Sequence, residues 1–102
     1  GYPVFDGRYV YFNALYNGST YNGEVLRYDT SGNFTNTTSW DVAISAPGTE
    51  VKFEPKPEMG NCDSPGACYD YCKENPGKCE GVDPKSPKPV DIYIPNTPFH
   101  PF

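Results

Sequence analysis

The fold is decided by residues 5–12, which read Phe-Asp-Gly-Arg-Tyr-Val-Tyr-Phe, and by residues 24–30, which read Glu-Val-Leu-Arg-Tyr-Asp-Thr. Tyr, Val and Phe dominate both runs, and the charged residues are spaced along them rather than clustered, which is typical of β-strands. Asp6-Gly7 is a dipeptide that suits a two-residue hairpin turn. We therefore predict that a sheet begins near the start of the chain.

The hydrophobic pattern predicts four strands in the first half of the chain. We expect them over residues 2–5, 8–13, 24–29 and 40–44 or 40–45. Side chains alternate between the two faces of a strand, so Tyr9 and Tyr11 share one face. Val10 and Phe12 then share the other face. Because both faces are largely apolar, the pattern indicates a sheet that is covered on both sides.

The composition changes at Pro47, since eleven of the twelve prolines lie from that residue onward. Residues 50–54 alternate polar and apolar side chains and predict a fifth strand. Residues 83–89 read Asp-Pro-Lys-Ser-Pro-Lys-Pro and favour an extended spacer, and residues 90–94 predict a last strand. We therefore expect three segments: a β-sheet module over 1–54, a disulfide-bonded knot over 55–82, and a Pro-rich spacer with a C-terminal strand and tail over 83–102.

Four cysteines follow the pattern C-x5-C-x3-C-x6-C, at Cys62, Cys68, Cys72 and Cys79. Ser64-Pro65 is typical of a helix start, and Asn75-Pro76-Gly77 is typical of a helix end, so we expect a short helix between them. Cys68 and Cys72 then lie four residues apart on one helix face, where geometry disfavours a bond between them.

Two disulfide connectivities remain open. Either Cys62 pairs with Cys72 and Cys68 with Cys79, or Cys62 pairs with Cys68 and Cys72 with Cys79. A zinc site is disfavoured, because paired C-x2-C knuckles are absent and no histidine lies nearby in the sequence. Disulfides indicate a location outside the cytosol. The expected fold class is mainly β: a small antiparallel sheet or sandwich with a short disulfide-stapled helical insert and an extended Pro-rich C-terminal strand.

The order and spacing of residues 5–12, 25–30, Phe34 and Ser39-Trp40 carry a resemblance. The pattern FDGRYVYF … VLRYDT … F … SW resembles one unit of a tandem repeat of uncharacterised surface proteins, which is similar to a four-stranded β-propeller blade. The resemblance covers residues 2–45. Only one copy is present here, and one blade can neither close a ring nor bury both of its faces. The resemblance therefore implies that residues 46–102 or neighbouring copies supply the missing contacts.

Three N-glycosylation sequons lie within about twenty residues, at Asn17, Asn33 and Asn36. All three fall in expected loops of a chain that also carries disulfides. Asn, Gly, Ser and Thr are common turn residues, so a single sequon is weak evidence. Three close together favour a glycoprotein, and we predict sugar on at least one of them.

Composition and motifs argue against several functions. The net charge of −5 opposes binding to a nucleic-acid backbone, and no apolar run has the length of a membrane span. Calcium loops, phosphate-binding glycine loops and nucleophile elbows are absent from the sequence. His100, the single histidine, lies between Phe99 and Pro101 with no nucleophile beside it. We therefore expect no enzyme, no metal and no cofactor other than covalent N-glycans, and we expect turn or cap roles for Asp6, Asp29, Asp41 and Asp91.

These features favour a structural subunit of an extracellular, cell-surface fibre or assembly whose partners are copies of itself. An assembly strand would add to the sheet of the next copy, head to tail, through Val90, Ile92, Tyr93 and Ile94. A second hypothesis is a secreted carbohydrate-binding or adhesion module that stacks sugars on Trp40, Tyr16 and Tyr21. A third is a small disulfide-rich protease inhibitor that inserts residues 73–78. The start at Gly1, without Met, indicates a mature product or one segment of a longer chain.

Overall fold

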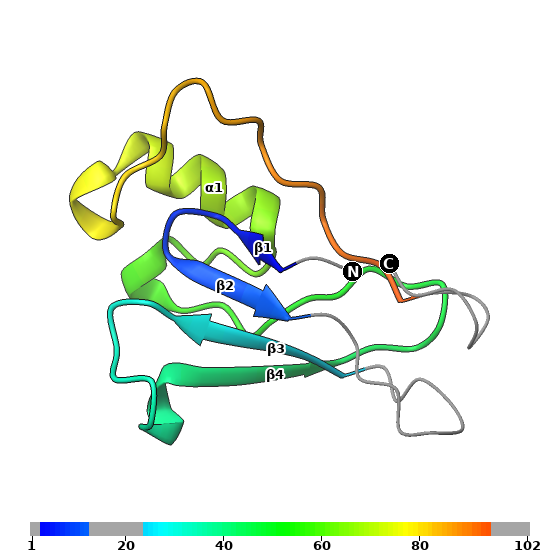
Figure 1. The fold of residues 1–102 in the computed structure, drawn as a ribbon. Coiled ribbons are helices and arrows are strands. Elements are labelled where there is room, and N and C mark those ends of the chain that lie inside the picture. Colours follow the sequence, from blue (N-terminus) through cyan, green and yellow to red (C-terminus); the bar gives the residue numbers. More distant parts are fainter. Residues whose placement is uncertain (1–2, 13–23, 95–102) are drawn as a thin grey trace.

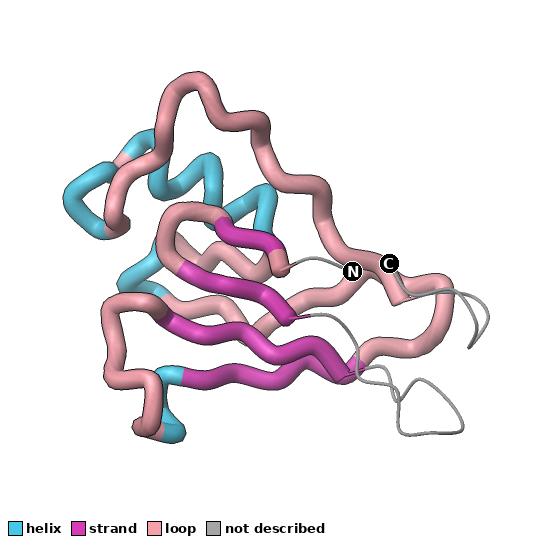
Figure 2. Tube along the Cα trace, in the orientation of Figure 1, coloured by secondary structure: helices cyan, strands magenta, loops and turns pink. Residues whose placement is uncertain are grey.

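A computed structural model describes residues 3–12 and 24–94 of the chain. The described part contains a four-stranded antiparallel sheet in the order β1-β2-β3-β4, with one α-helix after it (Figure 1). The strands are β1 (Val4–Phe5), β2 (Tyr9–Phe12), β3 (Glu24–Asp29) and β4 (Trp40–Ile44), and the helix is α1 (Pro65–Glu74). Short 3-10 turns are η1 (Thr37–Ser39), η2 (Pro57–Met59) and η3 (Pro76–Lys78). Figure 2 shows long loop segments on either side of α1.

The four predicted strands are confirmed, but the first turn is shifted by one residue. Phe5 pairs with Val10, and the backbone N–H of Asp6 donates to the carbonyl of Tyr9 at 3.2 Å. Gly7 and Arg8 are therefore the central residues of the hairpin turn, in place of the predicted Asp6-Gly7. Gly7 has a φ of 109°, a conformation that a side chain would strain, which explains why the glycine takes the first central position.

The predicted strands over 50–54 and 90–94 are wrong as regular strands. One isolated bridge joins them, between Glu50 and Tyr93. The physical reason is that the hydrogen bonds of this region go to different partners. The N–H of Val51 donates to Ile92, whereas the N–H of Phe53 donates to Asp63. A ladder needs one continuous neighbour, and residues 50–54 lie beside residues 92–94 only as far as Val51.

The predicted helix is confirmed at both ends. Ser64 is the N-cap, and its hydroxyl accepts a hydrogen bond from the N–H of Ala67. At the other end the N–H of Asn75 donates to Tyr71, and Pro76 prevents further helix. The disulfides are Cys62–Cys68 and Cys72–Cys79, with Cα–Cα distances of 5.1 and 5.6 Å. The second of the two open connectivities is thus the one adopted.

One face of the sheet, which we call the core face, is buried. Its side chains are Val4, Asp6, Tyr9, Tyr11, Val25, Arg27, Asp29, Asp41 and Ala43. They pack against the loop before α1, the four cysteines and the end of the described chain, chiefly through Val51, Phe53, Met59, Ile92 and Ile94. Figure 1 shows α1 and the loop before it on one side of the sheet. A single core therefore draws on all three of the segments expected from the sequence.

Candidate functional site

The opposite face of the sheet is apolar and partly exposed, and we call it the open face. Its side chains are Phe5, Val10, Phe12, Leu26, Tyr28, Trp40, Val42 and Ile44, with one charged residue, Glu24, opposite Ile44. The exposed fractions are 47% for Phe5, 54% for Val42 and 73% for Ile44. The expectation of a sheet covered on both sides is therefore not met by the described residues. Contiguous exposed apolar surface of this kind marks sites of interaction.

Four aromatic rings cluster on the open face at the start of β4. The ring of Trp40 lies 5.0 Å from Tyr28, 5.1 Å from Phe34 and 5.8 Å from Phe12, measured between centroids. The indole N–H of Trp40 donates to the carbonyl of Phe34 at 2.7 Å, which fixes the ring. Phe34 is 61% exposed and closes the cluster on its outer side. Trp40 is thus half-buried among rings, three of which the glycan-stacking hypothesis did not include.

Two residues assigned to that hypothesis, Tyr16 and Tyr21, lie outside the described residues, as does the sequon at Asn17. Two of the three partner rings of Trp40 could have been found from the sequence. Alternation along each strand puts Phe12 on the same face as Val10, and Tyr28 on the same face as Leu26. The sequence does not give the register between the two strands, so it does not show that these two rings meet beside Trp40.

The loop between β3 and β4 carries two sequons on the surface. Asn33 and Asn36 are both exposed. The side-chain carbonyl of Asn33 accepts the N–H and hydroxyl of Thr35, at 3.0 and 2.9 Å. Asn36 accepts the same two bonds from Thr38. Because the carbonyl oxygen takes both bonds, they leave the amide nitrogen, the atom that N-glycosylation modifies, unengaged.

Residues 83–94 form a segment that we call the C-terminal arm. The spacer predicted to be extended over 83–89 begins instead with a turn, in which the N–H of Ser86 donates to the carbonyl of Asp83 at 2.9 Å. The end of the arm is held by backbone hydrogen bonds to residues 48–51 of the same chain. The carbonyl of Ile94 accepts from Gly48 at 2.8 Å, and the N–H of Ile94 donates to Thr49 at 3.0 Å. The carbonyl of Ile92 accepts from Val51 at 2.7 Å. The arm therefore docks in the manner of a strand, although the ladder is too short to form one.

The side chains of the predicted assembly strand divide between the interior and the surface. Ile92 and Ile94 are buried in the core, whereas Tyr93 is 54% exposed and Val90 is 81% exposed. The alternation predicted for Ile92 and Ile94 is thus present, but Val90 does not share their burial. The carboxylate of Asp91 accepts the N–H of Gly66 at 2.9 Å and joins the arm to the start of α1.

The core face holds a buried guanidinium that the sequence reasoning did not anticipate. Arg27 is fully buried and donates to the Asp41 carboxylate at 3.0 Å. Its guanidinium carbon lies 4.2 Å from the centroid of the Tyr9 ring and 4.6 Å from that of Phe53, so two rings sandwich the charge. Burial raises the pKa of Tyr9 to about 12, so this hydroxyl stays protonated at neutral pH.

Asp6 is the second buried charge of the core face. Its carboxylate accepts the N–H groups of Arg8 and Tyr9 and the hydroxyl of Tyr11, at 2.9, 2.8 and 2.6 Å. Burial raises the pKa of Asp6, and these hydrogen bonds oppose the shift. The turn role expected for Asp6 is confirmed, because three donors of the β1–β2 hairpin converge on it.

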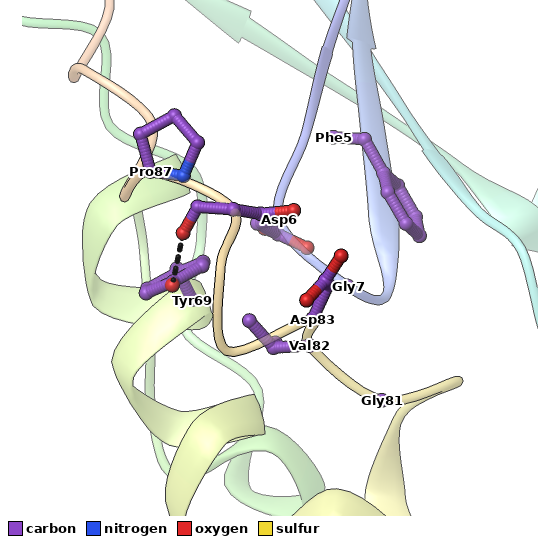
Figure 3. A pocket seen from close by; sticks show the side chains of 9 residues that line it. Phe5, Asp6, Gly7, Tyr69, Gly81, Val82, Asp83 and Pro87 are labelled. Atoms are coloured by element: carbon purple, nitrogen blue, oxygen red, sulfur yellow. Dashed lines mark hydrogen bonds between the residues drawn. The ribbon is translucent and has the colours of Figure 1, made fainter.

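A cleft of about 230 Å³ lies between this hairpin, α1 and the C-terminal arm (Figure 3). Tyr69 of α1 forms one wall, and its hydroxyl donates to the carbonyl of Ser86 at 2.9 Å. Asp83 and Val82 lie opposite, beside Gly7. The lining residues include two carboxyl groups, those of Asp6 and Asp83, and no histidine, lysine or arginine.

Two further features bear on function. Within residues 3–12 and 24–94, no group of three or more His, Cys, Asp or Glu side chains could hold a metal ion. Over the same residues, no helix has the length and apolar character that crossing a bilayer requires. Residues 73–78, which the third hypothesis would insert into a protease, are exposed and comprise the end of α1, Asn75 and η3.

Comparison with protein-family models, with curated proteins and with solved structures finds no match for the chain.

Proposed function

We propose that the chain is a structural subunit of an extracellular, glycosylated fibre or surface assembly built from copies of itself. The observation that carries this proposal is the open face. Phe5, Val42 and Ile44 are large apolar side chains that are each about half or more exposed on one side of a four-stranded sheet. Leaving them in water costs free energy that association recovers, at about 25 cal/mol per Å² of apolar surface buried.

The C-terminal arm supports head-to-tail assembly. In one chain it makes three backbone hydrogen bonds to residues 48–51 and buries Ile92 and Ile94. Residues 83–89, which contain three prolines and a turn from Asp83 to Ser86, connect this contact to the Cys72–Cys79 disulfide. An arm that leaves its own chain can make identical bonds to the next chain, because the acceptor site is the same in every copy. Because each chain both gives an arm and accepts one, such an exchange can continue from copy to copy without forming a closed oligomer.

Disulfides and sugars fit the same proposal. Two disulfides are compatible with a secreted protein, since thiols are kept reduced in the cytosol. Asn33 and Asn36 are exposed on the loop before β4, where glycans would stand out from the sheet. Sugar at these positions would keep the outside of a fibre soluble and limit non-specific aggregation.

The first test is electron microscopy of the purified full chain over a range of concentrations. Fibres are expected, and a sample that contains only single particles at every concentration contradicts the proposal. The second test places cysteines at the bridged pair, Glu50→Cys with Tyr93→Cys. Arms exchanged between chains give a covalent ladder on a denaturing gel. A product of monomer size with the new disulfide shows that the arm stays on its own chain and excludes exchange.

One observation favours a second candidate, a carbohydrate-binding module. The rings of Trp40, Tyr28, Phe12 and Phe34 form a partly exposed aromatic surface, and sugars stack on such surfaces. Glycan-array binding by the monomer, lost in Trp40→Ala and retained in Tyr93→Ala, would favour this function over the fibre. Tyr93 serves as the control because it is an exposed aromatic residue that does not belong to this ring cluster.

A further inference from the structure

One face of α1 holds the C-terminal arm through three residues, Gly66, Tyr69 and Asp70, which we call the α1 row. Tyr69 and Asp70 lie three and four residues after Gly66, so all three are neighbours on the helix surface. The hydroxyl of Tyr69 donates to the carbonyl of Ser86 at 2.9 Å (Figure 3). The Asp70 carboxylate accepts a hydrogen bond from the Lys88 ammonium at 2.7 Å. The arm is therefore bound along the helix as well as at its end.

Gly66, the first residue of the α1 row, lets the arm approach the helix backbone closely. Its N–H donates to the Asp91 carboxylate at 2.9 Å, in the first turn of α1, where the helix dipole favours a negative charge. A Cβ at Gly66 would lie 2.9 Å from Asp91 Oδ1 and 3.2 Å from Lys88 Cε. Lys88 thus meets an acid and Asp91 meets the positive end of the helix, so the charges of the arm match one direction along α1.

The chain immediately before the arm is fixed to the rest of the fold. Cys79 is joined to Cys72 by a disulfide, and the N–H of Glu80 donates to the carbonyl of Gly7 at 3.1 Å. Val82 packs against the core. An arm that leaves while these contacts stay intact must therefore leave after Val82.

The turn from Asp83 to Ser86 follows directly, and two local hydrogen bonds hold it. The N–H of Ser86 donates to the carbonyl of Asp83, and the N–H of Lys85 donates to the Asp83 carboxylate, both at 2.9 Å. Within the described residues, the backbone of 83–91 makes no hydrogen bond to backbone outside this turn. Ser86 precedes Pro87, a position that favours extended backbone, so the turn can open into a straight connection. Short loops of this kind absorb the backbone changes of a hinge.

We propose that the arm changes chains by opening of this turn, and that the α1 row of one copy binds residues 86–91 of the next. The inference rests on the proposed function, in which arms exchange, and it adds where the arm leaves and what receives it. The arm of a second copy is the occupant because the row already binds this segment, at the spacing of Ser86, Lys88 and Asp91, within its own chain. The same contacts then form between chains, and the Cys72–Cys79 disulfide is left unchanged.

Paired cysteines in the full chain distinguish this exchange from one in which only the end of the arm changes chains. Asp70→Cys with Lys88→Cys joins the α1 row to the arm, and Glu50→Cys with Tyr93→Cys joins the end of the arm to its backbone partners. Both pairs are expected to give covalent ladders on a non-reducing denaturing gel after mild oxidation. Glu74→Cys with Lys88→Cys is the control and is expected to give none, because Glu74 lies one turn beyond Asp70 and outside the row.

The two test pairs separate failure of this inference from failure of the proposed function. A ladder from the Glu50/Tyr93 pair, with a monomer-size or unlinked product from the Asp70/Lys88 pair, overturns the inference and leaves the proposed function intact. Monomer-size products from both pairs overturn both. A ladder from the Asp70/Lys88 pair alone supports the α1 row and overturns the exchange proposed at residues 48–51.

Charge reversal covers the case in which the added cysteines pair wrongly with the native ones. Asp70→Lys and Lys88→Asp, each in a separate full chain, place like charges at this half-exposed contact. An equal mixture of the two restores opposite charges, but only between unlike chains. At low salt, the fraction of protein that sediments as assemblies is expected to be about twofold or more higher in the mixture than in either variant alone. A mixture that assembles no better than the separate variants overturns the inference.

Discussion

In folded proteins charged side chains usually lie outside and apolar side chains inside, and the two faces of this sheet partly reverse that distribution. The buried core face contains charges, namely those of Arg27, Asp6, Asp29 and Asp41, together with Tyr9 and Tyr11. The open face contains Phe, Trp, Val, Leu and Ile side chains, a single Tyr and one charged residue, Glu24. Asp6, Asp29 and Asp41 are held by hydrogen bonds, whereas the Tyr9 hydroxyl and one guanidinium nitrogen of Arg27 are buried without a hydrogen-bond partner.

This difference divides two tasks between the faces. A buried ion pair contributes little net stability, because desolvation offsets much of the attraction, but it penalises any packing that leaves a charge unpaired. The core face therefore holds one arrangement of the sheet on the layer beneath it. The apolar side chains of the open face remain in contact with water, so burying them would favour association with another molecule.

The strongest test of this division removes the buried guanidinium. Arg27→Ala leaves a cavity between Tyr9 and Phe53 and deprives Asp41 of one partner. We expect the free energy of unfolding to fall by about 3 kcal/mol. Urea titration measures the loss, with Lys52→Ala as a control, because Lys52 is half-exposed and its change should be below about 0.5 kcal/mol. Equal losses would show that Arg27 does not organise the core face.

The next test loosens the layer that covers the core face. The Cys72–Cys79 disulfide closes a loop with a sequence separation of 7, beside Gly7 of the hairpin. The double variant Cys72→Ser with Cys79→Ser should lose about 2 to 3 kcal/mol of unfolding free energy. Thermal unfolding followed by circular dichroism measures the effect. A variant as stable as the wild type would mean that this disulfide does not hold the covering layer.

A smaller effect is expected from pH at the end of β3. Burial alone would raise the pKa of Asp29, but hydrogen bonds from Arg8 and Ser31 outweigh it and lower the pKa to about 2. A carboxyl whose pKa is lower in the folded state stabilises the fold above its unfolded pKa of about 3.9. That contribution is lost as the pH falls from about 4 toward 2. Allowing for solvent screening, it amounts to about 1 kcal/mol.

Urea titrations of the wild type and Asp29→Asn at several pH values measure this contribution. The wild type should be more stable near pH 5, and the difference should shrink as the pH falls from about 4 through about 2. A difference that stays constant over this range would show that the Arg8–Asp29 pair does not act through the charge of Asp29.

The parts of the fold that depend on sequence neighbours were predictable. Ser64-Pro65 and Asn75-Pro76 bound α1, and β3 has both of its predicted ends, because caps and alternation are local properties. Residues 50–54 and 90–94 have the same alternation but form no strand. Whether these residues form strands depends on the course of segments that are distant in the sequence. The two segments hydrogen-bond to each other over too few consecutive residues to make a strand pair.

The candidate site was predictable only in part, for a related reason. Alternation placed Val25 and Arg27 on one face of β3 and Leu26 and Tyr28 on the other, as the structure has them. Both faces are apolar enough to be buried, so the pattern could not indicate which one the chain covers. The course of the loop before α1 decides this, and it buries the face that carries Arg27.

The smallest expected effect gives the sharpest comparison of the two faces. Val25 and Val42 lie on neighbouring strands, the first fully buried on the core face and the second 54% exposed on the open face. Val25→Thr buries a hydroxyl and should cost about 2 kcal/mol of unfolding free energy. Val42→Thr makes the same chemical change in contact with water, so the monomer should lose less than about 0.5 kcal/mol. Urea titration at low protein concentration measures both. A loss at Val42 as large as that at Val25 would mean that the open face is already covered within one chain, and the hydrophobic surface proposed for association would then be absent.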